Sequence, residues 1–278
     1  MNTNSNTYTV IYSIGLVVIV AAVLAFVAKF LQPMQDANVK KDTISQILTA
    51  AGIEYTDDNI LEVYKENIDT AIVVKVDGEN WSADKLKKDE RLDISKCEIF
   101  TNAQLKEQTD AADAAKKLPV FIFKNGITVV PCYGAGLWGP VWGYIGLKSD
   151  LETINIACFD HKGETPGLGA KIADKPEEGK PAVFSELFKN KKVGEGAVKF
   201  EVKKNADPKG ASEVNAISGA TITSAAAGKM VNTWFGFYQN YFKKNGKPCE
   251  AEGDCEEQEC GSEGTDAPAE ELGEESAN

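Results

Sequence analysis

The hydrophobic positions form one long run near the N-terminus and shorter, periodic runs after it. Val10 to Ala28 contains no charged residue, and Lys29 closes the run. As a helix rising about 1.5 Å per residue, such a run is long enough to cross a hydrocarbon core of about 30 Å. The pattern therefore predicts one transmembrane helix over residues 8–32, after a short tail at 1–7. Pro33 is expected to end this helix, because proline lacks the backbone donor that a helix interior needs.

A cleaved signal peptide is the alternative interpretation of this run. Residues 1–9 carry no Lys or Arg, the run exceeds the usual apolar length, and no small-x-small cleavage pattern follows Ala28. The sequence therefore favours a permanent anchor with one soluble domain tethered behind it. Because Lys29, Lys40 and Lys41 follow the span and no positive charge precedes it, the positive-inside rule alone would place that domain in the cytoplasm.

Residues 33–118 are expected to form the N-terminal part of the soluble domain. Their pattern predicts a short helix between Asp42 as N-cap and Gly52 as C-cap, a second helix, and a strand that ends in a turn. These elements are expected at Thr43–Ala51, Asp57–Asn67 and Ala71–Val76, with the turn at Asp77-Gly78. Helix and loop cannot be separated over residues 79–118, and no chemistry stands out there.

The following segment, 119–243, is richer in strand-forming residues. Two β-rich runs flank Asn125-Gly126, which is a strong local signal for a hairpin. The last element is an amphipathic helix that begins among small residues and repeats large apolar side chains at helical spacing. The hairpin strands are expected at Val120–Phe123 and Ile127–Val130, further strands at Val141–Leu147, Leu151–Phe159 and Val198–Lys203, and the helix's apolar face at Met230, Val231, Trp234, Tyr238, Tyr241 and Phe242.

Charge divides the chain at its C-terminal end. The formal net charge is −12, yet residues 249–278 hold twelve acidic residues and no Lys or Arg, which leaves thirty acidic against thirty basic residues elsewhere. A neutral domain lacks the basic surface that nucleic acid binding requires. We therefore expect an α+β protein: a transmembrane helix, one mixed α/β soluble domain, and a disordered acidic tail over 244–278. The part of the tail from Cys249 to Asn278 is expected to be dispensable for cofactor binding and activity.

Three glycine-rich segments are the candidates for chemistry, because glycine lets the backbone approach a ligand closely. They are Gly134–Pro140, Gly163–Gly169 and Ser218–Ser224. The third offers hydroxyls and backbone N–H groups directly before the final helix, which is the arrangement of an anion site. An ordinary helix cap is the alternative explanation for that segment, and the residues alone do not decide between the two.

Together these segments resemble a known family. Ser-Gly-Ala-Thr at 218–221 resembles the flavinylation motif of the FMN-binding domain family, and the other two segments are similar to the C subunit of the Na⁺-translocating NADH:quinone oxidoreductases. The resemblance covers residues 8–242. It implies FMN bound covalently through a phosphoester to Thr221. The positions that it implies around the cofactor are Ser218, Gly219, Ala220, Thr223, Leu137, Trp138, Glu164, Thr165, Leu168 and Gly169, with Thr223 and Ser224 also placed as caps of the final helix.

The resemblance also implies a function. The chain would be an electron-transfer subunit of an inner-membrane NADH:quinone reductase that transports sodium, relaying electrons from an iron–sulfur centre to another subunit's flavin and towards quinone. Its partners would be the other subunits, a flavin transferase and membrane lipid, and its soluble domain would face the periplasm, against the three-lysine signal. The alternatives are the G subunit of the Rnf-type ferredoxin:NAD⁺ oxidoreductase complex and a flavin-free, membrane-anchored accessory domain.

Several residues are left outside this expected site. His161 is interpreted as a solvated loop histidine, and Trp142 as core packing. Trp138, which the resemblance places at the cofactor, is explained equally well by core packing. The odd number of cysteines before the tail, Cys97, Cys132 and Cys158, indicates buried free thiols, and no Cys-x-x-Cys pair exists to hold a metal. Asn215 departs from the family pattern, which often has an acidic residue there for the transferase.

Overall fold

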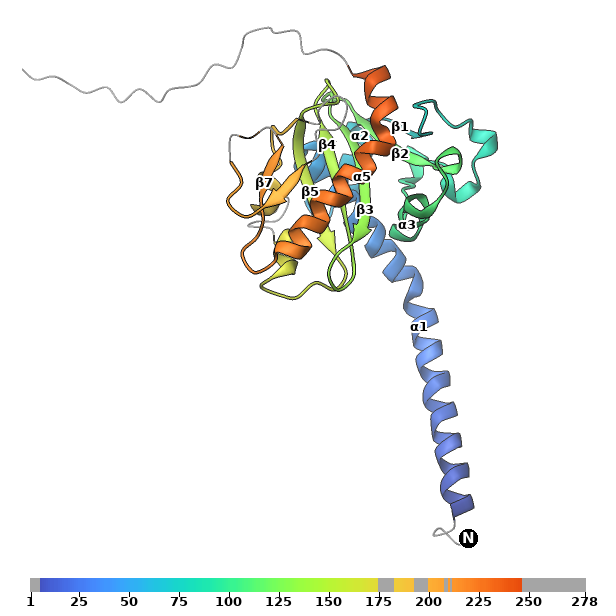
Figure 1. Ribbon diagram of the computed structural model, residues 1–278. Coiled ribbons are helices and arrows are strands. Elements are labelled where there is room, and N and C mark those ends of the chain that lie inside the picture. The colour runs from blue at the N-terminus through green and yellow to red at the C-terminus, as the bar shows by residue number, and fades with distance from the viewer. Residues whose placement is uncertain (1–5, 175–182, 193–199, 208–209, 211, 247–278) are drawn as a thin grey trace, which may run out of the picture. The chain divides into compact units, whose positions relative to one another are not determined.

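The computed structural model describes residues 6–174, 183–192, 200–207, 210 and 212–246 (Figure 1). The described part is a mixed α/β protein, as the sequence predicts. Five single-turn 3₁₀ helices are also described, the last of them at Gly169–Ile172. The helices are α1 (Asn6–Ala51), α2 (Ile60–Asn67), α3 (Asn102–Asp110), α4 (Val183–Glu186) and α5 (Thr221–Asn245), and the strands are β1 (Ile68–Val74), β2 (Leu118–Phe123), β3 (Thr128–Ala135), β4 (Pro140–Leu147), β5 (Ile154–His161), β6 (Glu201–Lys203) and β7 (Glu213–Asn215).

The central feature is a five-stranded antiparallel sheet in which β1 to β5 lie in sequence order. The predicted hairpin is confirmed, with Gly126 at φ +81° in the turn between β2 and β3. Strand β5 begins at Ile154, later than predicted, because Asp150 Oδ1 accepts the N–H groups of Glu152 and Thr153 and holds a turn there. Strands β6 and β7 form a separate parallel pair.

Helix α1 differs most from the sequence prediction. It is one continuous helix of 46 residues through Pro33, and the predicted short helix is its last part (Figure 1). The prediction that Pro33 ends the helix is wrong: α1 continues through it despite the lost hydrogen bond and the ring clash, which together cost about 3 kcal/mol. Asp42 is therefore not an N-cap, and its Oδ2 accepts a hydrogen bond from Gln46 instead. By length and composition α1 is the one helix, among the described residues, that qualifies as a membrane span.

The C-terminal end of α1 belongs to the soluble domain. Gly52 caps it as predicted, at φ +72°, with Gly52 N–H bonded to Thr49 O and Ile53 N–H to Leu48 O, the Schellman arrangement. Its last two turns are buried, whereas the apolar residues from Val10 to Val27 are exposed. The anchor helix thus docks on the sheet without an intervening loop.

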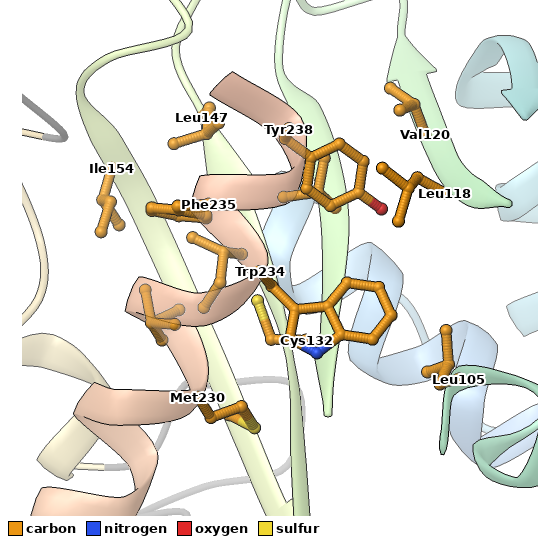
Figure 2. Close-up of a cluster of buried hydrophobic side chains, with 14 of the residues drawn as sticks. Leu105, Leu118, Val120, Cys132, Leu147, Ile154, Met230, Trp234, Phe235 and Tyr238 are labelled. Atoms are coloured by element: carbon orange, nitrogen blue, oxygen red, sulfur yellow. The ribbon is translucent and has the colours of Figure 1, made fainter. Parts of the chain in front are cut away.

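Both faces of the sheet are buried, which explains why its strands are apolar rather than alternating. One face packs against the end of α1 and against α2, around Phe121, Phe123 and Tyr144. The other packs against α5, where Trp234 and Tyr238 lie over the sheet (Figure 2). Trp234 Nε1 donates to Tyr133 O and the Tyr238 hydroxyl donates to Pro119 O, both at 2.7 Å, so these buried polar atoms of α5 are paired.

Local contacts explain two differences from the sequence prediction. One is the structure of residues 79–118, which the sequence leaves undecided, and the other is the start of α2, which the sequence places too early. Residues 79–118 contain 3₁₀ turns and α3, which a capping box between Thr101 and Gln104 starts. The buried Lys116 ammonium donates to Gln108 O at 2.9 Å near the end of α3. Helix α2 begins at Ile60 rather than Asp57 because a turn between Thr56 and Asn59 precedes it.

At Gly146 the backbones of α1 and β4 approach each other closely. A Cβ added to Gly146 would overlap the carbonyl oxygen of Ala50. Gly146→Ala is therefore expected to cost about 3 kcal/mol, or roughly 6–12 °C in melting temperature. Gly236→Ala is the matched control, since its Cβ would meet open space on α5 and is expected to stabilise by about 0.5–1 kcal/mol. Thermal unfolding of the detergent-solubilised chain measures both, and an unchanged melting temperature for Gly146→Ala would contradict the close docking.

Candidate functional site

The three glycine-rich segments meet at one buried carboxylate. Glu164, 4% exposed, lies in the loop after β5. Its Oε1 accepts the backbone N–H groups of Leu137 at 2.8 Å and Trp138 at 3.0 Å, in the β3–β4 hairpin tip. Its Oε2 accepts the Thr223 hydroxyl at 2.7 Å, from the first turn of α5. One side chain therefore joins its own loop to two other segments, through donor residues that lie 26, 27 and 59 positions from it in sequence.

Two glycines give the carboxylate its space. A Cβ added to Gly136 would overlap Glu164 Oε1. A Cβ on Gly169 would lie 2.6 Å from Glu164 Oε2 and 2.7 Å from the Thr223 hydroxyl oxygen. Neither position therefore accommodates a side chain while Glu164 keeps its place. The family resemblance indicates Gly169 as a site residue, and the structure explains its presence by close packing around the carboxylate.

The charge of Glu164 is stabilised despite its burial. Burial alone would raise the pKa of this carboxyl, but hydrogen bonds from Thr223 and from the backbone of Trp138, Leu137 and Gly139 outweigh burial and lower the pKa below its ordinary value. The group is therefore an ionised acceptor at neutral pH. The site contains a fixed negative charge that is fully occupied by donors of the protein.

Helix α5 begins at Thr221, the last residue of the Ser-Gly-Ala-Thr motif. Gly219, at φ +80°, makes the preceding turn. Ala220 occupies the N-cap and supplies no side-chain acceptor, so it leaves the first-turn N–H groups of α5 uncapped. The expectation that Thr223 and Ser224 cap this helix is wrong, because both lie inside its first turn; Ser224 Oγ donates to Ala220 O and accepts the Ile217 N–H.

The hydroxyls of this segment differ in exposure. Thr223 and Ser224 are 1% and 0% exposed, and both are engaged in hydrogen bonds inside the protein. Ser218 is exposed and Thr221 is half-buried. Of the hydroxyl-bearing residues in the first turn of α5, Thr221 is thus the one that is not buried.

Exposed apolar side chains gather in the same three segments. The exposed fractions are 70% for Trp138, 63% for Ile222, 46% for Leu137 and 44% for Leu168. An added Cβ on Gly219 would lie 3.0 Å from Leu168, so that side chain lies beside the motif. A contiguous exposed apolar patch is a sign of a binding surface, so these side chains are candidates for contact with a ligand. Sequence reasoning missed Ile222, which reads as an ordinary helix residue.

The remaining candidate residues also separate into exposed and buried side chains. Thr165 is exposed, and its carbonyl accepts the N–H groups of Leu168 and Ala170. Trp138 is not core packing, whereas Trp142 packs against the sheet's α1 face and donates to Gln46 Oε1 at 3.3 Å, so its interpretation as packing is confirmed. Cys97, Cys132 and Cys158 are buried and form no disulfide, as expected, and the described residues contain no cluster of potential metal ligands.

Two residues have contacts that sequence reasoning did not assign. His161 is the last residue of β5 rather than a loop residue, and its Nδ1 accepts the Glu164 N–H at 3.3 Å. Asn215 Oδ1 accepts the Ala206 N–H at 2.8 Å. An Asp at 215 would offer the same acceptor, so the departure from the family pattern keeps this contact.

Comparison with known proteins assigns the site to a family. The FMN-binding domain model matches residues 136–236, which include all the residues of the candidate site. A model described as a helicase-associated putative binding domain, C-terminal, matches residues 27–64, which lie outside that site. The first match spans all three glycine-rich segments from Gly136 onward.

Curated relatives and solved structures agree with the first match. The C subunits of Na(+)-translocating NADH-quinone reductase from Haemophilus ducreyi and Neisseria meningitidis serogroup B are each 30% identical, over 84% of this chain and 90% of theirs. A crystal structure of the same subunit from Parabacteroides distasonis is 33% identical, covers 76% of this chain and 96% of its own, and has a TM-score of 0.61. The chain therefore belongs to the C-subunit family of the Na⁺-translocating NADH-quinone reductases, an oxidoreductase complex whose other subunits are its partners.

Proposed function

We propose that this chain carries FMN as a phosphoester on Thr221 and relays electrons through it. The observation that carries the proposal is the arrangement around Glu164, which gathers three segments, with Thr221 only half-buried at the helix start. FMN supplies one- and two-electron chemistry when bound. The protein's share is to hold the phosphate, position the ring and limit access of solvent.

The start of α5 suits a phosphate. The first-turn N–H groups of a helix are donors without intrahelical partners, and the helix dipole places roughly half a positive charge there. Ala220 does not compete for these donors. Ser218, in the exposed turn before the helix, adds a hydroxyl within the same motif. A phosphoester on Thr221 would thus place its negative charge where the helix favours an anion.

Attachment requires an activated flavin. An alcohol does not displace water from a phosphate monoester under mild conditions, so the donor must be a phosphoanhydride such as FAD. The Thr221 oxygen forms the new P–O bond, the anhydride P–O bond breaks, AMP leaves, and the hydroxyl proton goes to solvent. A flavin transferase is the expected catalyst, since the described residues around Thr221 include no general base placed on its hydroxyl.

The ring suits the exposed apolar side chains beside the motif. Trp138 and Leu137 come from the hairpin tip, Leu168 from the Glu164 loop and Ile222 from α5. An isoalloxazine packed on these groups would cover apolar surface that otherwise faces water. A ring held this close to the surface would also remain within reach of partner subunits. The route we propose runs from an iron–sulfur centre, through this FMN, to a flavin of another subunit and then towards quinone.

The relatives favour this function over the two alternatives. The relatives from Haemophilus ducreyi, Neisseria meningitidis and Parabacteroides distasonis are all named as the C subunit of the sodium-translocating reductase, whereas the G subunit of the Rnf-type complex would serve ferredoxin and NAD⁺. A flavin-free accessory domain would need no accessible hydroxyl at the helix start. In-gel fluorescence of the denatured chain, co-expressed with an active flavin transferase, tests for covalent flavin directly. A fluorescent band is expected, whereas a dark band from the intact, folded chain would support the accessory domain.

We further propose an inner-membrane location with the soluble domain on the periplasmic side. The tail cysteines Cys249, Cys255 and Cys260 lie outside the described residues and serve as reporters. An impermeant thiol reagent is expected to label them in cells whose inner membrane is intact. Labelling that appears only after the inner membrane is permeabilised, with the thiols reduced beforehand, would place the domain in the cytoplasm, as Lys29, Lys40 and Lys41 suggest.

A further inference from the structure

The single histidine of the chain contacts the residue that joins the three segments. His161 is half-buried at the end of β5, and its backbone N–H donates to Asp160 Oδ1 at 2.7 Å. Its Nδ1 accepts the backbone N–H of Glu164 at 3.3 Å. The next residue, Lys162, still bonds to Pro140 O of the neighbouring strand at 3.0 Å. The imidazole therefore acts where the chain leaves the sheet and turns into the Glu164 loop.

This contact fixes the tautomer of the imidazole. An N–H donor faces Nδ1, so Nδ1 must carry a lone pair, and the proton of the neutral ring lies on Nε2. The same contact fixes the main chain of Glu164, from which the carboxylate reaches Leu137, Trp138 and Thr223. A fixed backbone at Glu164 favours the carboxylate position that accepts all three donors from two separate elements.

We propose that His161 is a positioning residue for the flavin site: its Nδ1 holds the Glu164 backbone so that the carboxylate joins the hairpin tip to the start of α5. His161 acts on the helix start through Glu164 and not through a contact of its own with Thr221. The proposal rests on the proposed function for its consequence in flavin attachment. The positioning itself is a property of the flavin-free protein and is measured there.

The first test requires no substitution. Because the chain contains one histidine, selective ¹⁵N labelling of histidine in the full chain in detergent micelles gives one pair of imidazole nitrogen signals. At a pH where the ring is neutral, Nδ1 is expected to be the unprotonated nitrogen and Nε2 the protonated one. The opposite tautomer would overturn the proposal, because a protonated Nδ1 cannot accept the Glu164 N–H.

The second test uses a matched pair of variants. In His161→Asn the amide oxygen is as many bonds from Cβ as Nδ1 and keeps an acceptor, whereas His161→Leu has a methyl group there. Loss of one hydrogen bond of typical strength lowers amide protection about tenfold. Hydrogen exchange at Leu137 and Trp138 of the flavin-free chain is expected to quicken about tenfold in His161→Leu, and His161→Asn is expected to remain near wild type. Equal protection in His161→Leu and wild type, or no rescue by Asn, would overturn the proposal.

Flavin attachment then separates this proposal from the proposed function. With limiting flavin transferase and FAD, the initial rate of labelling is expected to fall about tenfold in His161→Leu and to recover in His161→Asn. If the wild-type chain takes up no flavin, the proposed function fails, while the exchange and tautomer results still decide the role of His161. If exchange changes as expected and labelling rates are equal, His161 positions the loop but not the flavin site, and the proposal is overturned.

Discussion

Thr221→Ala is expected to abolish covalent flavin while the chain still folds. Thr221 is half-buried at the first position of α5 and makes no side-chain cap for the helix, so its methyl and hydroxyl contribute little to stability. The phosphoester is not expected to form on Thr223 or Ser224, the other hydroxyls of the first turn, because both are buried. Co-expression with the transferase, followed by in-gel fluorescence and circular dichroism, measures flavin and fold in the same sample.

Two control variants sharpen this result. Thr221→Ser keeps a hydroxyl and is expected to retain flavin. Thr223→Val removes the hydroxyl that donates to Glu164, so it is expected to lower the flavin content without moving the attachment from Thr221. The assignment would be contradicted by full flavin content in Thr221→Ala, or by complete loss in Thr223→Val with retention in Thr221→Ala.

Glu164→Ala is expected to produce the largest loss of stability at the site. It removes the acceptor of three donors, the Leu137 and Trp138 N–H groups and the Thr223 hydroxyl. Thr223 is buried, so its unpartnered hydroxyl costs about 1–3 kcal/mol, whereas the part-buried N–H groups of Leu137 and Trp138 can turn to water and cost about 0.5–1.5 kcal/mol each. We therefore expect a loss of about 2–5 kcal/mol in total. Denaturant unfolding of the detergent-solubilised chain measures it, and a cost below about 1 kcal/mol would show that Glu164 does not hold the segments together.

Glu164→Gln is the conservative counterpart of Glu164→Ala, and its effect on the unfolding free energy is expected to depend on pH. The folded state lowers the pKa of Glu164, so its carboxylate contributes stability that is present above the ordinary carboxyl pKa and is lost as pH falls through the folded pKa. The difference in unfolding free energy between wild type and Glu164→Gln is therefore expected to be largest near neutral pH and to shrink below about pH 4. A difference that stays constant down to about pH 3 would contradict the ionised, hydrogen-bonded carboxylate.

The fold was predictable where a local signal decides the structure. Asn125-Gly126 specifies a hairpin, and the spacing of Trp234, Tyr238 and Phe242 specifies the final helix. Pro33 shows the limit of such rules, because a local penalty does not outweigh the hydrogen bonds and packing of a long helix that docks on the sheet. The end of α1 could be recognised as helical from its apolar spacing, but not as a continuation of the anchor.

The sequence identifies the segments that form the site, but it does not show how their side chains contact one another. Glycine spacing and the family resemblance indicate Gly134–Pro140, Gly163–Gly169 and the Thr221 motif. Which hydroxyl is accessible depends on burial in the first turn of α5, and no sequence pattern gives that burial. The link from Glu164 to all three segments is made by contacts far apart in sequence, and the contact of His161 depends on β5 extending to that residue.

The most direct test of the central claim is to locate the flavin on the chain by mass spectrometry. Trypsin is expected to release residues 210–229 as one peptide, which contains Ser218, Thr221, Thr223 and Ser224. From the chain co-expressed with its transferase, this peptide is expected to carry the mass of one FMN less one water, with fragment ions that place it on Thr221. An unmodified peptide from chain co-expressed with an active transferase, or fragment ions that place FMN on Thr223 or Ser224, would contradict the account.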